Sequence, residues 1–273
     1  MIGILAAAAI AAASPASPPA ATTTNADPAI FVVHDGDTTV YLFGTFHALD
    51  SKTQWFDAQV KDAFEQSDEL VLETLLPEGP RQPGLALKGP PTPPVALRMP
   101  VASSASFLAT TRLAISAGRS QGMQVGNGAD MVLRRIAEDE GKPVEGLESL
   151  QFQLDMFNRM PPAAPPASAV PGRPVGNAAS MDGLQKAMAE MQAAWKRGDQ
   201  SVFVRMLGQA ERSSPDTYRM MFVERNAHFA EWIAARMQKP GVVFVAIGAG
   251  HLAGKDSVLV RLAERGIESQ RVN

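Results

Sequence analysis

Residues 38–47, TTVYLFGTFH, and residues 241–251, GVVFVAIGAGH, decide the fold of this chain. Each stretch is a run of β-branched, aromatic and aliphatic residues, which is typical of a β-strand. Each run ends in a glycine that is followed by a histidine three positions later. The second run is continuously apolar, as expected for a central strand that is buried on both faces. The sequence thus predicts two strands, far apart in the chain, that each deliver a histidine, His47 or His251, to the strand end.

Further strand and helix patterns fill the chain around these two stretches. Aspartate and glycine at positions 34–37 predict a hairpin turn between the strands, because both tolerate positive φ. Strands are expected at 30–33, 38–43, 69–72, 143–147 and 241–247, and helices at 55–67, 129–140, 181–237 (with breaks near 198 and 213–215) and 256–264. We therefore predict an α/β fold, a mixed β-sheet with internally duplicated strand–Gly-x-x-His–helix units and flanking helices.

Composition excludes several classes of partner and site. The formal charge is −3, from 25 basic and 28 acidic residues, and the basic residues form no stripe that would neutralise phosphates, so nucleic acid is not an expected partner. The chain has no cysteine, which excludes disulfides, thiolate catalysis and zinc sites that need sulfur. A metal site in this chain would have to use imidazole and carboxylate ligands.

The chain divides into a leader, a linker and one domain. Residues 1–13 are apolar and end in small residues, as a signal peptide does, so we expect a periplasmic or secreted protein. Residues 14–28 are rich in Pro, Ser, Thr and Ala and are expected to be a flexible linker. Residues 29–273 are expected to form a single domain with proline-rich loops at 77–106 and 158–180. No later segment has the length and apolar character of a membrane span.

Four polar residues come directly after predicted strands, at the edge where ligands bind in α/β sheets: His47, Glu73, Glu148 and His251. If the strands are neighbours, two imidazoles and one or two carboxylates converge. Such a set can bind Zn, Mn, Co or Fe ions with positions left open for water and substrate. The alternative is that each histidine is simply a hydrogen-bonded residue at a strand end.

Arg225 and Asn226 form a second clue, because both fall on the apolar side of the helix expected around 216–237. Burying an unpaired guanidinium is costly, so Arg225 needs an anionic partner. That partner is either a substrate carboxylate or developing oxyanion, which would place both residues in the site, or a structural ion pair with Glu148 or Glu73.

The chain resembles the TraB/GumN family, which includes the Tiki metalloproteases. The motifs that carry the resemblance are YLFGTFHALD (41–50), LVLET (70–74), GKPVEGLES (141–149), WKRGD (195–199), ERN (224–226) and VFVAIGAGHLAGKDSVLVRLAERGI (243–267). The resemblance implies a metal site made by His47, His251 and Glu73. It adds Arg225, Asn226 and Glu148 as further site residues.

The leading hypothesis is a secreted or periplasmic metal-dependent hydrolase, most simply a peptidase acting on a peptide or small-molecule substrate. A divalent transition metal (Mn, Co, Zn or Fe) would activate water, and Arg225 with Asn226 would orient substrate or stabilise the oxyanion. Either Glu73 or Glu148 could be the ligand and the other the general base. Two alternatives stay open: a non-catalytic module that sequesters a peptide or a haem or metal ligand, and an esterase or lactonase-type hydrolase.

Overall fold

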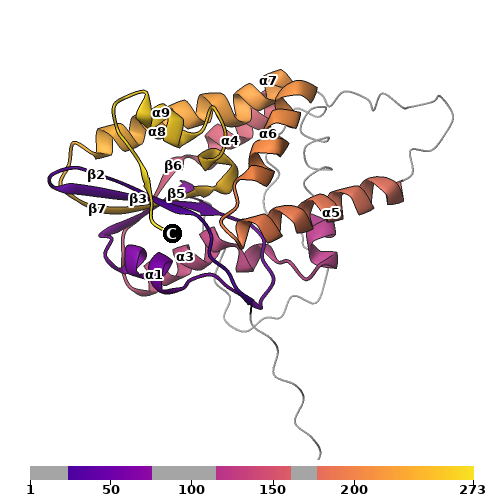
Figure 1. Ribbon diagram of the computed structural model, residues 1–273, viewed down its shortest axis with the longest axis horizontal. Helices are drawn as coiled ribbons and strands as arrows, with labels where there is room; N and C mark the ends of the chain where they lie inside the picture. Colours follow the sequence, from indigo (N-terminus) through magenta and orange to yellow (C-terminus); the bar gives the residue numbers. More distant parts are fainter. Residues whose placement is uncertain (1–23, 76–114, 161–176) are drawn as a thin grey trace, which may run out of the picture.

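The computed structural model describes residues 24–75, 115–160 and 177–273 (Figure 1). The expected signal peptide, the proline-rich stretch 77–106 and residues 161–176 of the second proline-rich stretch lie outside these ranges. Helix α5 (Asn177–Trp195) begins inside the region 158–180 that the sequence analysis assigned to a loop. In the described part of the chain, no helix has both the length and the apolar character needed to cross a membrane.

A six-stranded mixed sheet forms the centre of the fold, with strand order β6-β5-β7-β3-β2-β8. The strands are β2 (Ile30–His34), β3 (Thr38–Thr45), β5 (Glu69–Thr74), β6 (Val144–Glu148), β7 (Gly241–Gly248) and β8 (Gln270–Arg271). Strands β6, β5, β7 and β3 are parallel, whereas β2 and β8 run antiparallel to their neighbours. The predicted mixed α/β fold is confirmed, and the two strands that end in Gly-x-x-His are parallel neighbours.

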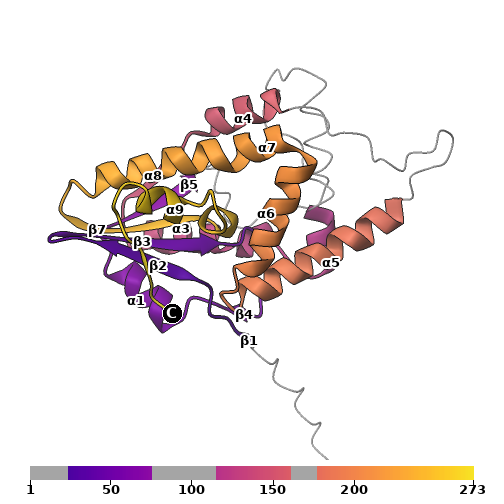
Figure 2. The ribbon, with the colours of Figure 1, turned by 45° about the horizontal axis from the view of Figure 1, so that its top comes forward.

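Helices cover both faces of the sheet (Figures 1 and 2). Helices α1 (Ala58–Glu65) and α3 (Ala129–Asp139) lie on one face, and α8 (Glu224–Arg236) and α9 (Val258–Ala263) lie on the other. Strand β7 is apolar throughout because its alternate residues pack into both layers. Phe244 and Ala246 belong to the core on the α1 and α3 side, and Val243, Val245 and Ile247 to the core on the α8 and α9 side.

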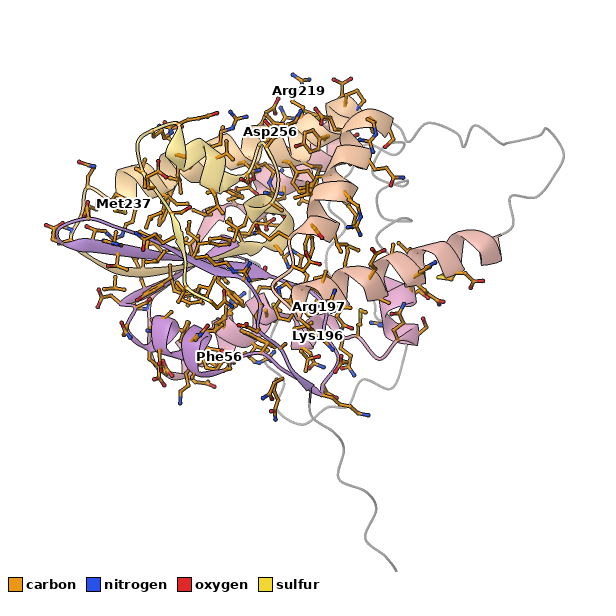
Figure 3. All side chains as sticks on the ribbon, viewed as in Figure 1. Phe56, Lys196, Arg197, Arg219, Met237 and Asp256 are labelled. Carbon is orange, nitrogen blue, oxygen red and sulfur yellow. The ribbon has the colours of Figure 1, made fainter. Side chains whose placement is uncertain are left out.

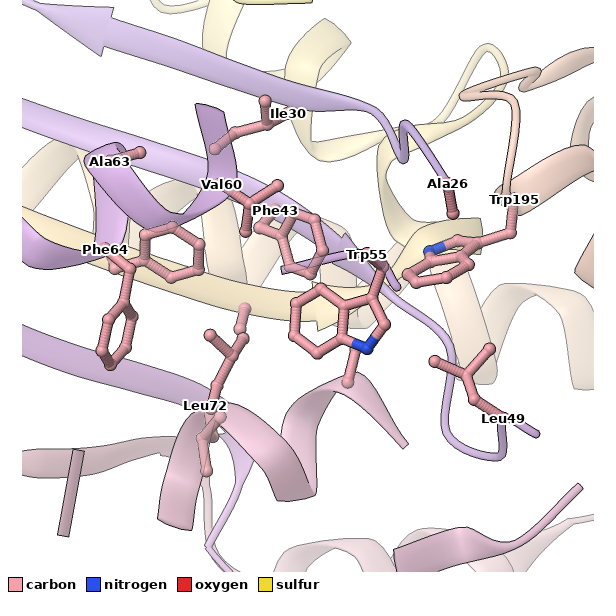
Figure 4. Close-up of a cluster of buried hydrophobic side chains, with 14 of the residues drawn as sticks. Ala26, Ile30, Phe43, Leu49, Trp55, Val60, Ala63, Phe64, Leu72 and Trp195 are labelled. Atoms are coloured by element: carbon pink, nitrogen blue, oxygen red, sulfur yellow. The ribbon is translucent and has the colours of Figure 1, made fainter. Parts of the chain in front are cut away.

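Aromatic rings fill the core on the α1 and α3 side (Figure 4). Phe43 stacks on Trp55 with ring centroids 5.5 Å apart and meets Phe244 at 5.8 Å and Trp195 at 6.4 Å. The Trp195 indole N–H also donates to the carbonyl oxygen of Gly44, at 2.7 Å. This bond ties the end of α5 to the end of β3, immediately before the site.

Regular structure is present in a segment where the composition indicates none. Strand β1 (Thr24–Asn25) pairs in parallel with β4 (Thr53–Gln54), within the stretch 14–28 that we expected to be a flexible linker. Ala26 explains the difference, because it is buried in the aromatic core and its backbone N–H donates to the carbonyl oxygen of Gln54. Backbone pairing and one small buried residue hold this segment, and neither produces a hydrophobic pattern.

A helical extension stands beside the carboxyl ends of the parallel strands (Figure 2). It contains α5, α6 (Ser201–Ser213), α7 (Pro215–Tyr218) and a π-helical turn (Arg219–Val223) that leads directly into α8. The predicted breaks near 198 and 213–215 are confirmed, and Gly198 turns the chain with φ of +61°. Helix α4 (Leu150–Arg159) was not predicted, although Ser149 caps it by accepting a hydrogen bond from the N–H of Phe152.

Candidate functional site

The strand order places the four predicted strand-end residues on adjacent strands. From the edge inward, β6 carries Glu148, β5 carries Glu73, β7 leads to His251 and β3 leads to His47. His251 lies in the short 3₁₀ turn Ala249–Leu252 that follows β7. The two glutamates differ from the expected placement, because both still lie within their strands. Glu148 is the last residue of β6 and pairs with Thr74, and Glu73 is the last residue but one of β5.

A cavity of about 360 Å³ opens at these strand ends. Its polar lining includes His47, Glu73, Arg225 and His251. Its apolar wall comes from α5, α6 and the π-helical turn and consists of Met188, Met191, Phe203, Met206, Leu207, Met221 and Phe222. The volume is in the range of small-ligand sites, which are typically apolar clefts with a few convergent polar groups.

Gly248 leaves a small space between three of the polar side chains. A Cβ atom at this position would lie 3.2 Å from Oε2 of Glu73, 3.3 Å from Nε2 of His47 and 3.5 Å from Cδ2 of His251. The Gly248 backbone N–H donates to the same Glu73 oxygen, at 2.9 Å. The two histidines from opposite ends of the chain therefore border one point, together with the carboxylate of Glu73.

His251 is held in one orientation and one tautomer. The Asn226 side-chain nitrogen donates to the carbonyl oxygen of Asp256 at 2.7 Å, so the amide oxygen of Asn226 faces His251 as an acceptor. Nδ1 of His251 lies 2.6 Å from that oxygen and must carry the proton. Nε2 is left as an acceptor on the side of the ring that faces Glu73, 3.7 Å from Oε2.

The surroundings of His251 keep its ring neutral. The imidazole is buried between the rings of Phe222 and Phe229, with both centroids 5.2 Å away. Burial, reinforced by the positive charges of Arg225 and His47, outweighs the attraction of Glu73 and lowers the pKa of His251 to about 4. His251 is thus an unprotonated base at neutral pH.

His47 is held by Asp130, a residue that we did not single out from the sequence. Its Nδ1 lies 3.4 Å from Oδ1 of Asp130, in the first turn of α3. The close approach depends on Gly128, where a Cβ atom would overlap the carbonyl oxygen of His47. Desolvation by the surrounding residues lowers the pKa of His47, although its side chain is 58 % exposed, but the close contact and charge of Asp130, with the charge of Glu73, outweigh this and raise the pKa to about 9. The sequence signal for Asp130 is an acidic residue in the first turn of a helix, which is too common to identify a site.

Arg225 occupies the centre of the site. Its side chain is only 3 % exposed, and it donates to both oxygens of Glu148, at 2.8 and 2.7 Å, and to Oε1 of Glu73, at 2.5 Å. The remaining nitrogen lies 3.4 Å from the carbonyl oxygen of Met221 and 3.3 Å from Nε2 of His251. Of the two partners considered for Arg225, the structure therefore shows the ion pair, and it involves both glutamates.

These contacts also define what Arg225 and Asn226 do in this conformation. The five N–H groups of a guanidinium are all engaged by the contacts of Arg225, which leaves none directed at a substrate. Asn226 is buried and orients His251 through its amide oxygen. Both residues are thus next to the predicted histidines, but they contact the site's own side chains.

Glu73 is ionised because of its neighbours. Burial alone would raise the pKa of its carboxyl, but the positive charges of His251, Arg225 and His47 outweigh burial and hold the pKa well below its usual range. Because His251 loses its proton above about pH 4, the counter-charges at neutral pH are those of Arg225 and His47.

Thr45 is a further cavity residue that the sequence analysis missed. It is the last residue of β3, lies opposite Gly248 in the sheet and lines the cavity. Its buried hydroxyl has no hydrogen-bond partner among the residues that the structure describes. Buried polar atoms without a partner are rare in proteins, so this hydroxyl is an unused hydrogen-bonding group beside the cavity. A threonine within a strand pattern gives no sequence signal for such a role.

The donor set fits a transition metal in its chemistry. Each histidine directs Nδ1 at an oxygen, of Asp130 or Asn226, which is the outer-shell arrangement of metal-binding imidazoles. Within residues 24–75, 115–160 and 177–273, however, no group of three or more His, Asp and Glu side chains is arranged so that it could hold a metal ion. In this conformation Arg225 supplies the positive charge beside Glu73.

Comparison with known proteins assigns the family. No curated protein and no solved structure gave a significant match. Residues 29–89 and 95–271 match the model of the TraB/PrgY/gumN family, which covers the whole sheet and the helices around it. The cavity at the strand ends, with its two Gly-x-x-His histidines, lies within the matched residues. The chain therefore belongs to the TraB/PrgY/gumN family.

Proposed function

We propose that this protein is a metal-dependent hydrolase that cleaves peptide bonds in the cavity at the strand ends. The observation that carries the proposal is the convergence of His47, His251 and Glu73 around the space beside Gly248. Neutral imidazole and carboxylate are the ligands that the first-row divalent metals Mn, Fe, Co and Zn accept, so metal binding would displace the proton that His47 carries at neutral pH. The apolar leader at residues 1–13 supports action in the periplasm or outside the cell.

In this proposal the metal ligands are His47, His251 and Glu73. A bound divalent metal supplies a Lewis acid and lowers the pKa of bound water, which generates a nucleophile at neutral pH. Asn226 keeps Nε2 of His251 unprotonated, and Asp130 orients the ring of His47.

In this proposal the remaining polar groups bind the substrate and balance the charge of the two glutamates. The hydroxyl of Thr45 is free to donate to a substrate carbonyl at the end of β3. Arg225 contacts both Glu148 and Glu73. If one of the two carboxylates takes up a proton, Arg225 keeps its ion pair with the other. The apolar wall from α5 and α6 excludes water from one side of the reacting bond.

Metal analysis and a cleavage assay test the proposal together. The full-length protein would be purified without chelator, its metal content measured, and its activity on a peptide library assayed with added Mn²⁺ or Co²⁺. We expect about one metal per chain and cleavage that is lost in His47→Ala and in His251→Ala. His34→Ala is the matched control, because His34 is an exposed residue of the hairpin between β2 and β3.

Two results would contradict the proposal. One is a wild-type chain that binds no divalent metal under these conditions. The other is cleavage that persists in both site variants at the level of His34→Ala.

A second candidate function is a non-catalytic module that sequesters an apolar peptide. It is favoured by the saturated contacts of Arg225 and by the methionines that line the cavity, because methionine side chains adapt to varied apolar ligands. This candidate predicts retention of peptide without turnover. The same library separates the two, since a retained and uncleaved peptide supports binding alone.

A further inference from the structure

A second and larger cavity, of about 740 Å³, lies on the other side of the Arg225–Glu148 ion pair. It is bounded by α4, by the π-helical turn and by the start of α8. Arg225 lines both cavities, and the neighbouring residues Met220 and Met221 of the π-helical turn line one cavity each. Single π-turns within α-helices are frequent at functional sites, because they redirect side chains.

Positive charge exceeds negative charge in the lining of this second cavity. Its acidic residues, Glu148 and Glu224, are both paired, the first with Arg225 and the second with Arg219 at 3.6 Å. Arg219 also lies 3.5 Å from Asp216, in an ion pair exposed to solvent. Arg159 also lines the cavity, and within the described part of the chain its guanidinium hydrogen-bonds only to the backbone carbonyl oxygen of Asp155, at 3.3 Å. A guanidinium near a carbonyl oxygen keeps its full charge and most of its donors.

The basic residues lie at an accessible rim. Arg219 and Arg159 are both exposed, and Figure 3 shows Arg219 at the outer edge of the layer that holds α7 and α8. His228 lines the cavity as well, with Nε2 3.4 Å from the carbonyl oxygen of Leu147. An anion that enters this cavity therefore meets two arginines and an imidazole.

The floor of the cavity is apolar. Met156 is buried there, Met220 is half-buried, and Phe152 is 42 % exposed at the first turn of α4. An exposed phenylalanine ring next to arginines can contact an apolar group while the arginines bind a carboxylate. The lining thus presents both halves of a site for an amphipathic anion.

We propose that this cavity binds a carboxylate that carries an apolar side chain, which is the chemistry of the C-terminal residue of a peptide. Arg159 and Arg219 bind the carboxylate, and Phe152, Met156 and Met220 contact the side chain. The proposal does not rest on hydrolysis at the strand-end cavity, because binding at this site requires neither metal nor turnover.

Calorimetric titration of the full chain tests the site with two matched probes. N-acetyl-phenylalanine presents the carboxylate and the ring, and N-acetyl-phenylalaninamide presents the ring without the charge. We expect the amide to bind about tenfold more weakly, as for the loss of one charged hydrogen-bond contact. Arg159→Gln and Arg219→Gln should each weaken the acid by a similar factor, and Phe152→Ala should weaken both probes.

Two further variants show whether the carboxylate binds at the arginines of this cavity. Glu224→Gln removes one of the two carboxylates that compete for Arg219, the other being Asp216, so it should tighten binding of the acid. Arg265→Gln is the matched control. It also removes one positive charge, but Arg265 is exposed and does not line the cavity, so binding should be unchanged. Equal binding of the two probes, or binding of the acid that survives both Arg159→Gln and Arg219→Gln, would overturn the proposal. Thermal unfolding of each variant shows that it is folded.

Discussion

Replacing Arg225 by methionine tests whether this residue is mainly an internal ion-pair partner. The change keeps the length of the side chain but removes every donor, so Glu148 loses two charged hydrogen bonds and Glu73 loses one. Each such bond contributes about 1.5–3 kcal/mol, but the contributions are not additive. Leaving a buried charge without its partner costs about 3–5 kcal/mol in known cases. We expect a loss of that size in the free energy of unfolding, or a fall in Tm of about 10 °C for a chain of this length.

Urea unfolding at pH 7 and pH 5 measures the loss. It should be smaller at pH 5, because a buried carboxylate without a partner takes up a proton more readily. The double variant Arg225→Met/Glu148→Leu should recover part of the lost stability, since it removes one of the two carboxylates that lost their partner, and Glu73 still accepts from the N–H of Gly248. Arg236→Met is the control: Arg236 makes one ion pair, with Glu69 at 2.8 Å near the surface, so about 1 kcal/mol or less is expected.

The opposite result would refute this reasoning. If Arg225 served mainly to bind a substrate carboxylate, its replacement would change stability by less than about 1 kcal/mol and would impair only ligand binding. A loss that small, with no difference between pH 7 and pH 5, would show that the contacts to Glu148 and Glu73 contribute little to the folded state.

Three further substitutions have defined outcomes. Asp50→Asn should lower the free energy of unfolding at pH 7 by about 1–3 kcal/mol, measured by urea unfolding. Burial opposes the ionisation of Asp50, but its hydrogen bonds, of which that from Lys196 is the strongest, outweigh burial and lower its pKa to about 2. This stabilisation is complete above the usual aspartate pKa of 3.8 and is lost as pH falls through 2, so the variant and the wild type should converge in acid. Trp195→Phe should lower the free energy of unfolding by about 1–3 kcal/mol, because the carbonyl oxygen of Gly44 loses its buried hydrogen-bond donor. A variant as stable as wild type in thermal unfolding would contradict this. Gly128→Ala should displace the loop that carries His47, because the new Cβ would overlap the backbone carbonyl of His47. Unchanged NMR signals of the His47 imidazole would contradict this.

The fold was largely predictable because the strands carry distinct patterns. The apolar run at 241–247 indicated a strand buried on both faces, and β7 lies inside the sheet with a core on each side. The elements that we missed include α4, which begins at a serine cap, and the short strands β1 and β4, which pair through their backbones and leave little apolar periodicity. Patterns of burial are readable from a sequence, whereas pairing between backbones is not.

Most residues of the candidate site could be predicted from the sequence, but the contacts between them could not. Helical periodicity placed Arg225 and Asn226 on a buried face, and both are buried. That Arg225 bridges both glutamates depends on the order of four strands, which periodicity does not determine. Asp130 and Thr45 were missed because their positions, a first helical turn and a strand end, are ordinary places for polar residues.

The central position of β7 has a consequence for how the chain folds. β7 is the last of the four parallel strands to be synthesised, and it pairs with β3 on one side and β5 on the other. A nascent chain that ends before residue 241 has both of those strands without their partner, so their apolar edges are open to other chains until the C-terminal residues emerge. Residues 241–252 thus complete the parallel part of the sheet and supply His251, so the cavity at the strand ends cannot form before these residues have been synthesised.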